Sequence, residues 1–507
     1  MGINLISSII VFIVQMGINF FLTPFILKSL GNEAFGFLNL ANSIVSYGYI
    51  LSVAINSVAG RFVALEYHKL NSIRANYYFS TVVVANIFFT ILVAILSVIF
   101  TLNLEFFLNI SQNLTSDVKL MFLVYFLNFC LGLFNTIFTI TAFVKNKIYI
   151  ISIRNAISSI IFGLGIILFF YFFLPKLYYV AICALISSFF VFFSTVSISK
   201  KIAPDIKFNI SNFSFKMVKK LLNSGIWNSF NALNRVLLTG LDLLICNLFI
   251  SPVAMGILSV SKTGPLIIES FVATICSTFF PKLVEIYSKK NITALISETK
   301  FYIKVVAFII TTPCVIFAIL GIDFFTLWLN FKEKSEILEI YQLCMISLVP
   351  IIFISYVFVL FNIDSVTNKL KRPAMANLVL GISTILSQIL ILKYTEFGLF
   401  GIVIVAAVLY SLRILIFDII NASLNLSLNI FTFYRPIFIN IAIFAIFLII
   451  FYFFKKFISI NSWLDFIKFT TIFLLFGYTL NFIILFNKSE KSIILNKIFI
   501  KFKRIKN

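Results

Sequence analysis

The chain has 507 residues, of which 61% are hydrophobic and only 11% are charged. Soluble proteins carry about 25% charged residues, so this composition argues against a soluble enzyme, a disordered chain and a nucleic-acid-binding domain. The net charge of +22 is large, but the basic residues are not gathered on a soluble domain as nucleic-acid binding requires. With a mean hydropathy of +1.10, the sequence predicts an all-α polytopic membrane protein.

Cysteine and histidine usage argues against a metal or redox site. The six cysteines stand singly in apolar stretches without a CxxC pair, so we interpret them as small buried hydrophobic residues. His68 is the only histidine, which argues against a His-ligated zinc site. The sequence also lacks a GxxxxGK[ST] phosphate-binding loop. We therefore expect no cofactor, no metal and no nucleic-acid partner.

Fourteen apolar segments are long enough to cross a bilayer, which takes about 20 residues per helix. The first is interpreted as a span and not as a signal peptide, since no basic residue precedes it and no cleavage site follows. The predicted segments are 5–27, 36–59, 78–102, 119–143, 149–173, 178–199, 222–250, 255–280, 302–322, 338–361, 375–393, 397–423, 436–454 and 466–487.

Lys and Arg are distributed unequally between alternate loops. One set of loops, with the C-terminal tail, holds 28 of the 40 basic residues, the opposite set holds 9, and 3 lie inside spans. Because basic loops stay on the cytoplasmic side, this bias predicts a multi-pass membrane protein with both termini in the cytoplasm. Most of the positive charge would then face anionic lipid headgroups.

A shift of 220 residues superposes parts of the chain on itself. Phe35-Gly36-Phe37-Leu38 falls on Met255-Gly256-Ile257-Leu258. Six spans enter the membrane from the same side as the next six, so the two halves should be related by an axis along the membrane normal. We predict an N-terminal six-helix lobe (1–200), a basic cytoplasmic linker (201–220), a C-terminal six-helix lobe (221–424), two additional helices (425–487) and a basic cytoplasmic tail (488–507).

Polar residues follow one face of spans 1, 2, 7 and 8. One face of span 7 has residues at three- or four-residue spacing, namely Asn228, Asn231, Arg235, Leu238 and Asp242. The shift of 220 brings equivalent faces of the other three spans to one place, which we infer to be a central cavity between the lobes. The polar residues of these three faces include Gln15 in span 1, Asn39, Asn42 and Asn56 in span 2, and Lys262 and Glu269 in span 8.

Charges inside the membrane cost about 2.5–3.5 kcal/mol each, so they are expected to be paired. Equal depths on neighbouring spans predict two ion pairs, Asp242–Lys262 and Arg235–Glu269. The pairs could serve only to let the helices insert. Alternatively, Arg235 and Lys262 meet an anionic substrate, with the carboxylates as placeholders or as coupling groups. Arg413 and Asp418 in span 12 are weaker candidates.

Basic residues near the cytoplasmic ends of the spans allow two interpretations. Arg61, at the inner end of span 2, either meets an anionic headgroup or anchors the helix by the positive-inside rule. The linker and the tail alternate bases with Ile, Phe and Leu, a pattern typical of a basic helix lying on the inner leaflet. A solvated tail is the alternative.

Residues 21–36 read FLTPFILKSLGNEAFG, which resembles the opening of polysaccharide-export flippases. These are the O-antigen and lipid-linked oligosaccharide transporters of the multidrug/oligosaccharidyl-lipid/polysaccharide (MOP) exporter superfamily. Asp242, Gly256 and the polar Lys145-Asn146-Lys147 break are similar to the same family, and the resemblance covers about residues 1–420. It implies two lobes in a V around a cationic cavity that moves an undecaprenyl-pyrophosphate-linked oligosaccharide to the outer leaflet.

Site roles follow from this resemblance. Arg235, Lys262 and Arg61 would hold the pyrophosphate, while Asp242 and Glu269 would act in ion pairing or coupling. The sugar hydroxyls would meet Gln15, Asn39, Asn42, Asn56, Asn228 and Asn231. Implied partners are membrane lipids, polymerase or ligase machinery, and an H⁺ or Na⁺ counter-ion.

Two other functions remain open. A multidrug exporter of the same superfamily would need cavity carboxylates without cationic partners. A membrane enzyme on the same lipid carrier would usually carry a sizeable outward loop, and the loops here are short, so we expect the protein not to be an enzyme.

Overall fold

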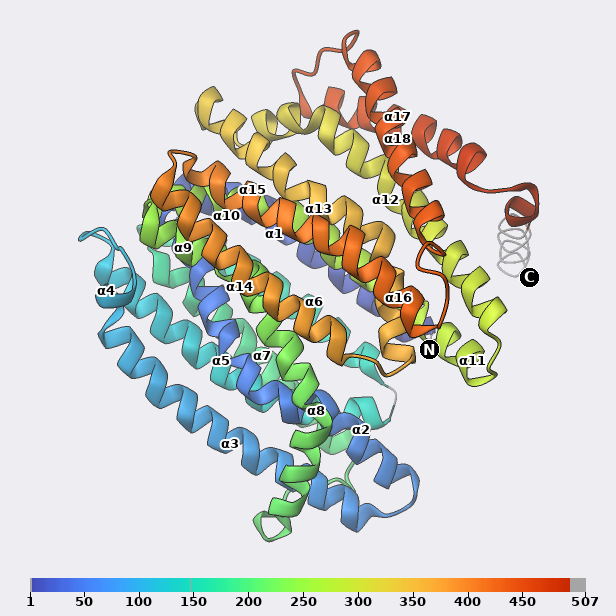
Figure 1. Cartoon of the computed structure of the whole chain (residues 1–507). Coiled ribbons are helices and arrows are strands. Elements are labelled where there is room, and N and C mark those ends of the chain that lie inside the picture. Colours follow the sequence, from blue (N-terminus) through green and yellow to red (C-terminus); the bar gives the residue numbers. More distant parts are fainter. Residues whose placement is uncertain (1, 146, 493–507) are drawn as a thin grey trace, which may run out of the picture. The chain divides into compact units, whose positions relative to one another are not determined.

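The computed structural model describes residues 2–145 and 147–492, and it contains helices joined by short loops (Figure 1). For residues 2–6, 8, 9, 51, 148, 235, 238 and 239 only the backbone is described. The α-helices are α1 Gly2–Tyr47, α2 Tyr49–His68, α3 Ser72–Leu102, α4 Leu104–Phe107, α5 Thr115–Val144, α6 Ile148–Phe172, α7 Leu177–Ile202, α8 Phe215–Arg235, α9 Asp242–Phe249, α10 Pro252–Ser277, α11 Phe280–Ser288, α12 Ile292–Trp328, α13 Lys334–Val366, α14 Lys371–Tyr394, α15 Gly398–Leu412, α16 Ile419–Asn425, α17 Tyr434–Lys455 and α18 Trp463–Leu485.

The predicted all-α membrane class is confirmed. All fourteen predicted segments fall on helices, and twelve helices among the described residues are long and apolar enough to cross a membrane. Two differences separate these numbers. The first two segments run together in α1, where Gly31 turns the chain at a φ of +83° that glycine tolerates. Segment 222–250 is divided by the π-turn η2, Val236–Gly240.

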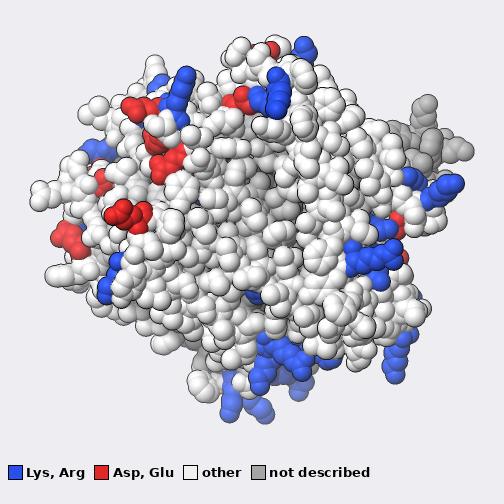
Figure 2. Space-filling view, turned by 45° about the horizontal axis from the view of Figure 1, so that its top comes forward, with Lys and Arg blue, Asp and Glu red and all other residues white. Residues whose placement is uncertain are grey.

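The chain forms two compact units whose boundaries cross several helices. Unit 1 comprises Met1–Val260 and Asn377–Ile402, and unit 2 comprises Ser261–Ala376 and Val403–Asn507. Most surface residues in Figure 2 are uncharged, as expected for helices whose outer faces meet lipid. The predicted lobes 1–200 and 221–424 stay a prediction.

Unit 1 is held together by close helix pairs, chiefly α5 with α7 and α2 with α3 and α8. Its core at one end includes Val63, Val82 and Leu221, from α2, α3 and α8, which are fully buried. Gly225 allows α8 to approach α2, because a Cβ atom at this position would lie 1.9 Å from the Ala54 carbonyl oxygen. Contact this close between backbones needs a residue without a side chain.

Unit 2 is built around α12, which packs against α13, α17 and α18. The last two helices are therefore part of its core. The hydroxyl of Tyr478 donates to the Ile309 carbonyl oxygen at 3.1 Å, and the side-chain amide of Asn481 donates to the Phe308 carbonyl oxygen at 3.2 Å. An ion pair joins Lys455 of α17 to Asp323 of α12 at 2.7 Å.

The linker between α7 and α8 differs from the amphipathic helix that its pattern predicts. Residues 203–214 are irregular apart from the 3₁₀-turn η1, Ile210–Asn212, and α8 begins only at Phe215. The reason is local: Pro204 disfavours the preceding helical residue, and Asn209 uses its side chain to accept the backbone N–H of Ser211 at 3.1 Å. The tail beyond residue 492 lies outside the described residues.

Replacing Gly225 by alanine should separate α8 from α2. We expect Gly225→Ala to lower the free energy of unfolding by about 1–3 kcal/mol, since the new methyl group collides with backbone that cannot move aside. Thermal unfolding of the detergent-solubilised protein would measure this. Gly132→Ala is the matched control, because a Cβ atom there has no neighbour within 4 Å. Equal stability of the two variants would contradict the packing described here.

Candidate functional site

Residues that the sequence repeat makes equivalent meet each other inside unit 1. The side-chain amide of Asn39 donates to the Ser259 hydroxyl oxygen at 2.6 Å, and the two residues are 220 positions apart, the shift of the repeat. One turn earlier, a Cβ atom on Gly36 would lie 2.8 Å from the backbone nitrogen of Gly256, again its equivalent. In a two-fold arrangement, a residue touches its own counterpart only near the axis. These contacts therefore favour the predicted pseudo-symmetry.

The glycines at this contact determine how close α1 and α10 come. A Cβ atom on Gly256 would lie 2.1 Å from the Asn32 carbonyl oxygen. The obstacle is backbone, so rotation of a neighbouring side chain could not relieve it. The contact thus requires glycine in both repeats, and it lies at the end of each repeat's first helical hairpin.

Two of the predicted asparagines, Asn56 and Asn228, join α2 to its neighbours. Asn56 of α2 and Asn86 of α3 exchange amide hydrogen bonds of 2.9 and 2.8 Å. Asn228 of α8 donates to the Ser57 hydroxyl at 2.9 Å. These two predicted sugar ligands therefore take part in helix contacts in this conformation.

The other predicted site residues differ in how far protein covers them. Asn42 is exposed, and its side chain hydrogen-bonds to buried Tyr125. Lys262 and Glu269 are half-buried and each has an interaction partner. The Arg235 side chain lies outside the described residues. The remaining three, all exposed, are Gln15, Arg61 and Asn231.

Asp242 lies buried at the start of α9, with 4% of its surface exposed. Gln388 of α14, fully buried, donates its amide to Asp242 Oδ1 at 3.0 Å and to the Ile402 carbonyl oxygen at 3.0 Å. The hydroxyl of Tyr47 donates to the carbonyl oxygen of Gly240 in the π-turn just before Asp242. The ion pairs Asp242–Lys262 and Arg235–Glu269 stay predictions, since their members fall in different units or outside the described side chains.

Sequence analysis missed Gln388, although one signal was present. It is the only glutamine in the predicted span 375–393, which is largely apolar. A buried amide needs a hydrogen-bonding partner, but nothing in the sequence indicates that the partner lies 146 residues away.

Unit 2 holds a second buried polar cluster, at the junction of α13 and α16. Asp364 Oδ1 accepts the side-chain amides of Asn421 at 2.9 Å and Asn425 at 2.6 Å. Arg413 Nη2 donates to Asp418 Oδ1 at 2.8 Å, and both side chains are more than nine-tenths buried. The pair is part of the π-turn η3, Arg413–Asp418, which aligns residues five apart better than an α-helix does. Asp418, Asn421 and Asn425 have the i, i+3, i+7 spacing that marks one helix face, a signal that sequence analysis did not use.

The described residues contain no group of three or more His, Cys, Asp or Glu side chains that could hold a metal ion. All six cysteines are buried, and none of them forms a disulfide bond. What these sites offer is hydrogen bonding by amides and hydroxyls around a few buried carboxylates.

Comparison with known structures places the fold among MOP-superfamily transporters. A lipid II flippase, MurJ, in an inward closed conformation superposes with a TM-score of 0.69 at 15% identity, covering 95% of this chain and 98% of that one. A multidrug resistance MATE-family transporter of the MOP superfamily, inward-facing, gives 0.63 at 12% identity, covering 82% and 94%. These neighbours are transporters and flippases, not enzymes. The protein thus has the fold of a MOP-superfamily transporter or flippase.

In sequence, the chain is similar to the uncharacterized membrane protein EpsK of Bacillus subtilis (strain 168). The two are 27% identical over 420 residues, which is 82% of this chain and 81% of EpsK. No family model matches the chain.

Breaking the buried Arg413–Asp418 pair should destabilise unit 2. We expect Arg413→Met to cost about 3–5 kcal/mol, because it leaves the Asp418 carboxylate buried without its partner. The double variant Arg413→Met/Asp418→Leu should recover most of the loss, since neither charge remains. Denaturant unfolding in detergent would measure both. A double variant as unstable as the single one would show that the pair is not the source of the effect.

Proposed function

We propose that the protein is a flippase that moves an undecaprenyl-pyrophosphate-linked oligosaccharide, an O-antigen or other surface-polysaccharide repeat unit, from the cytoplasmic to the outer leaflet of the bacterial inner membrane. The fold, shared with MurJ and with MATE-family transporters, supports a transporter. That MurJ is a lipid II flippase supports a polyprenyl-linked glycan as cargo. A sugar–pyrophosphate head is too polar to cross lipid unaided, while its tail can stay in the membrane.

The observation that carries the proposal is the contact of Asn39 with Ser259 and of Gly36 with Gly256. An alternating-access transporter built from two repeats closes one side by bringing equivalent elements together and opens it by separating them. Small residues and a single neutral hydrogen bond suit a contact that must form and break in each cycle, since little energy is stored in it. Both termini would lie in the cytoplasm, which puts this contact at the outer side.

The predicted site roles belong to this proposal. Arg235, Lys262 and Arg61 would bind the pyrophosphate, since guanidinium and ammonium groups suit phosphate oxygens. The polar residues of spans 1, 2, 7 and 8 would meet the sugar, and Asp242 and Glu269 would act in ion pairing or in coupling to H⁺ or Na⁺. Polysaccharide polymerase or ligase machinery would take the product.

Loss of the protein should trap lipid-linked glycan on the cytoplasmic leaflet. We expect Arg235→Ala and Lys262→Ala to reproduce this accumulation, because each removes a positive charge from the head-binding region. Accessibility of the glycan lipid to a membrane-impermeant reagent would measure it. Lys393→Ala, which removes an exposed lysine at the end of α14, is the control and should translocate normally. Normal translocation by the first two variants would disprove the site roles. If instead the glycan lipid never accumulates and drug resistance falls, the protein is a multidrug exporter.

Linking the two repeats across their contact should stop the cycle. In the variant Asn39→Cys/Ser259→Cys, a short disulfide-forming crosslinker should join the two thiols and abolish translocation, and a reductant should restore it. The native cysteines are buried, so the single variant Asn39→Cys should be as active with the reagent as without it. Full activity of the crosslinked protein would contradict alternating access at this contact.

A further inference from the structure

The segment 203–214, called the strap below, is held to α3 by hydrogen bonds at several positions. It joins the candidate span α7 to α8. The backbone N–H of Lys207 donates to the Asn76 side chain at 2.9 Å, and that side chain donates back to the Asp205 carbonyl oxygen at 3.1 Å. Two hydroxyls of α3 accept further strap N–H groups: Ser80 from Asn209 at 3.1 Å and Thr81 from Ser214 at 3.3 Å.

Two apolar side chains hold the inner side of the strap. Ala203 and Ile206 are buried in the core formed by α2, α3 and α8. The strap is thus fixed at both its backbone and its inner side chains, and it cannot fold its remaining side chains inward.

The other side of the strap exposes large apolar residues. The exposed fractions are 47% for Phe208, 71% for Ile210 and 40% for Phe213, and Phe215 at the start of α8 is 75% exposed. Four large apolar side chains within eight residues are costly in water. Because the strap begins at the end of a candidate span, these side chains are placed where a bilayer surface begins.

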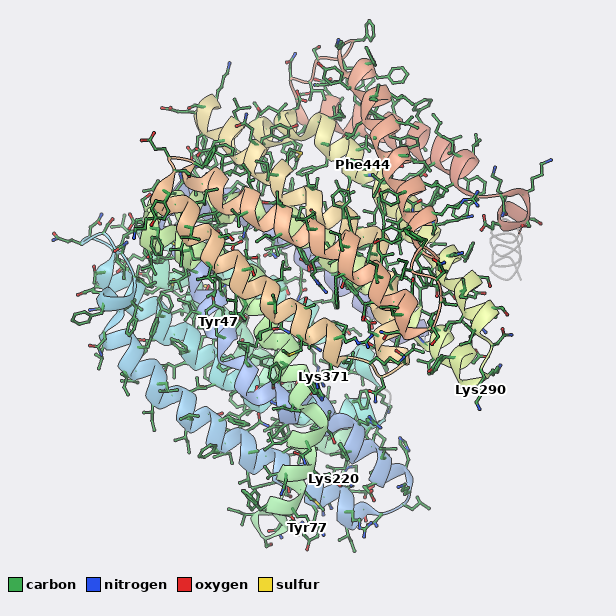
Figure 3. All side chains as sticks on the ribbon, in the orientation of Figure 1. Tyr47, Tyr77, Lys220, Lys290, Lys371 and Phe444 are labelled. Carbon is green, nitrogen blue, oxygen red and sulfur yellow. The ribbon has the colours of Figure 1, made fainter. Side chains whose placement is uncertain are left out.

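Lysines surround these apolar residues. Between residues 200 and 220 there are six lysines and one acidic residue, Asp205. Lys207, Lys216 and Lys219 are exposed, while Lys220 lies over the rings of Phe62 and Tyr78 at 5.4 and 5.8 Å. Figure 3 shows Lys220 and Tyr77 at the same end of unit 1. We call the exposed side chains of Lys207, Phe208, Ile210, Phe213, Phe215, Lys216 and Lys219 the strap surface.

We propose that the strap surface is a docking site for anionic phospholipid headgroups of the adjacent leaflet. Phenylalanine and isoleucine would enter the boundary between headgroups and acyl chains, and the lysines would reach the phosphates by extending their stems along the apolar surface. Juxtamembrane lysines are attracted to anionic lipid. A rigid support makes this binding more favourable, because little chain entropy is lost on docking. The proposal does not depend on the transported cargo.

The test uses the full chain in detergent, with Phe213→Cys carrying the environment-sensitive dye NBD. Short-chain phosphatidylglycerol is titrated in, with short-chain phosphatidylcholine and inorganic phosphate as separate arms. We expect a blue shift and brightening with phosphatidylglycerol, weak binding of phosphatidylcholine, and no effect of phosphate alone. Added salt should weaken the phosphatidylglycerol response, because it screens exposed charges.

Replacing the strap lysines should reduce the preference for anionic lipid. We expect the apparent affinity for phosphatidylglycerol to fall about fivefold for each substitution among Lys207→Gln, Lys216→Gln and Lys219→Gln. A control with Lys290→Gln, Lys334→Gln and Lys371→Gln removes three exposed lysines of unit 2 and should bind as the parent does.

Four results would overturn the proposal: no response to either lipid, equal responses to both lipids, an unchanged affinity in the strap-lysine variant, or binding of inorganic phosphate as strong as that of phosphatidylglycerol. The last would indicate an ion site, and no lipid response at all would favour a protein partner for this surface. If the lysine variant does not fold, the salt dependence of the parent protein still decides, since lipid docking without salt sensitivity would exclude a role for the lysines.

Discussion

The approach of two backbones at Gly36 and Gly256 is the constraint on which the proposed mechanism depends. Neither residue can carry a side chain while the helices stay at this distance. The hydrogen bond between Asn39 and Ser259 follows one turn later on the same helices. Residues 220 positions apart in the chain are thus in contact, as expected if the two predicted repeats are related by a pseudo-two-fold axis.

In both units, buried carboxylates accept hydrogen bonds from neutral side-chain amides. Asp242 accepts from Gln388, and Asp364 accepts from Asn421 and Asn425. An amide donor stabilises a carboxylate without adding a second charge that must itself be desolvated. Sequence reasoning sought only opposite charges for the acids, and so it did not anticipate these partners.

How much the sequence predicts depends on the range of the interaction involved. The helical segments were predicted because apolar runs of sufficient length report on the bilayer directly. The prediction of a helix in the linker was wrong. Its alternation of basic and apolar residues is compatible with a helix and with an irregular segment, and the segment is held in irregular form because its N–H groups donate to the side chains of Asn76, Ser80 and Thr81. Gln388 and the Asp364 cluster were missed because their partners are distant in the chain. The roles of Arg235, Lys262 and the sugar-facing asparagines stay predictions.

The π-turn at Arg413–Asp418 determines which face of the following helix is buried. It holds one residue more than the same length of regular α-helix. If the same residues formed a regular α-helix, everything after the turn would rotate by about 100°, and the face formed by Asp418, Asn421 and Asn425 would turn away from Asp364. The rotational position of this buried polar face therefore depends on a local backbone feature that the hydrophobic profile of the span does not reveal.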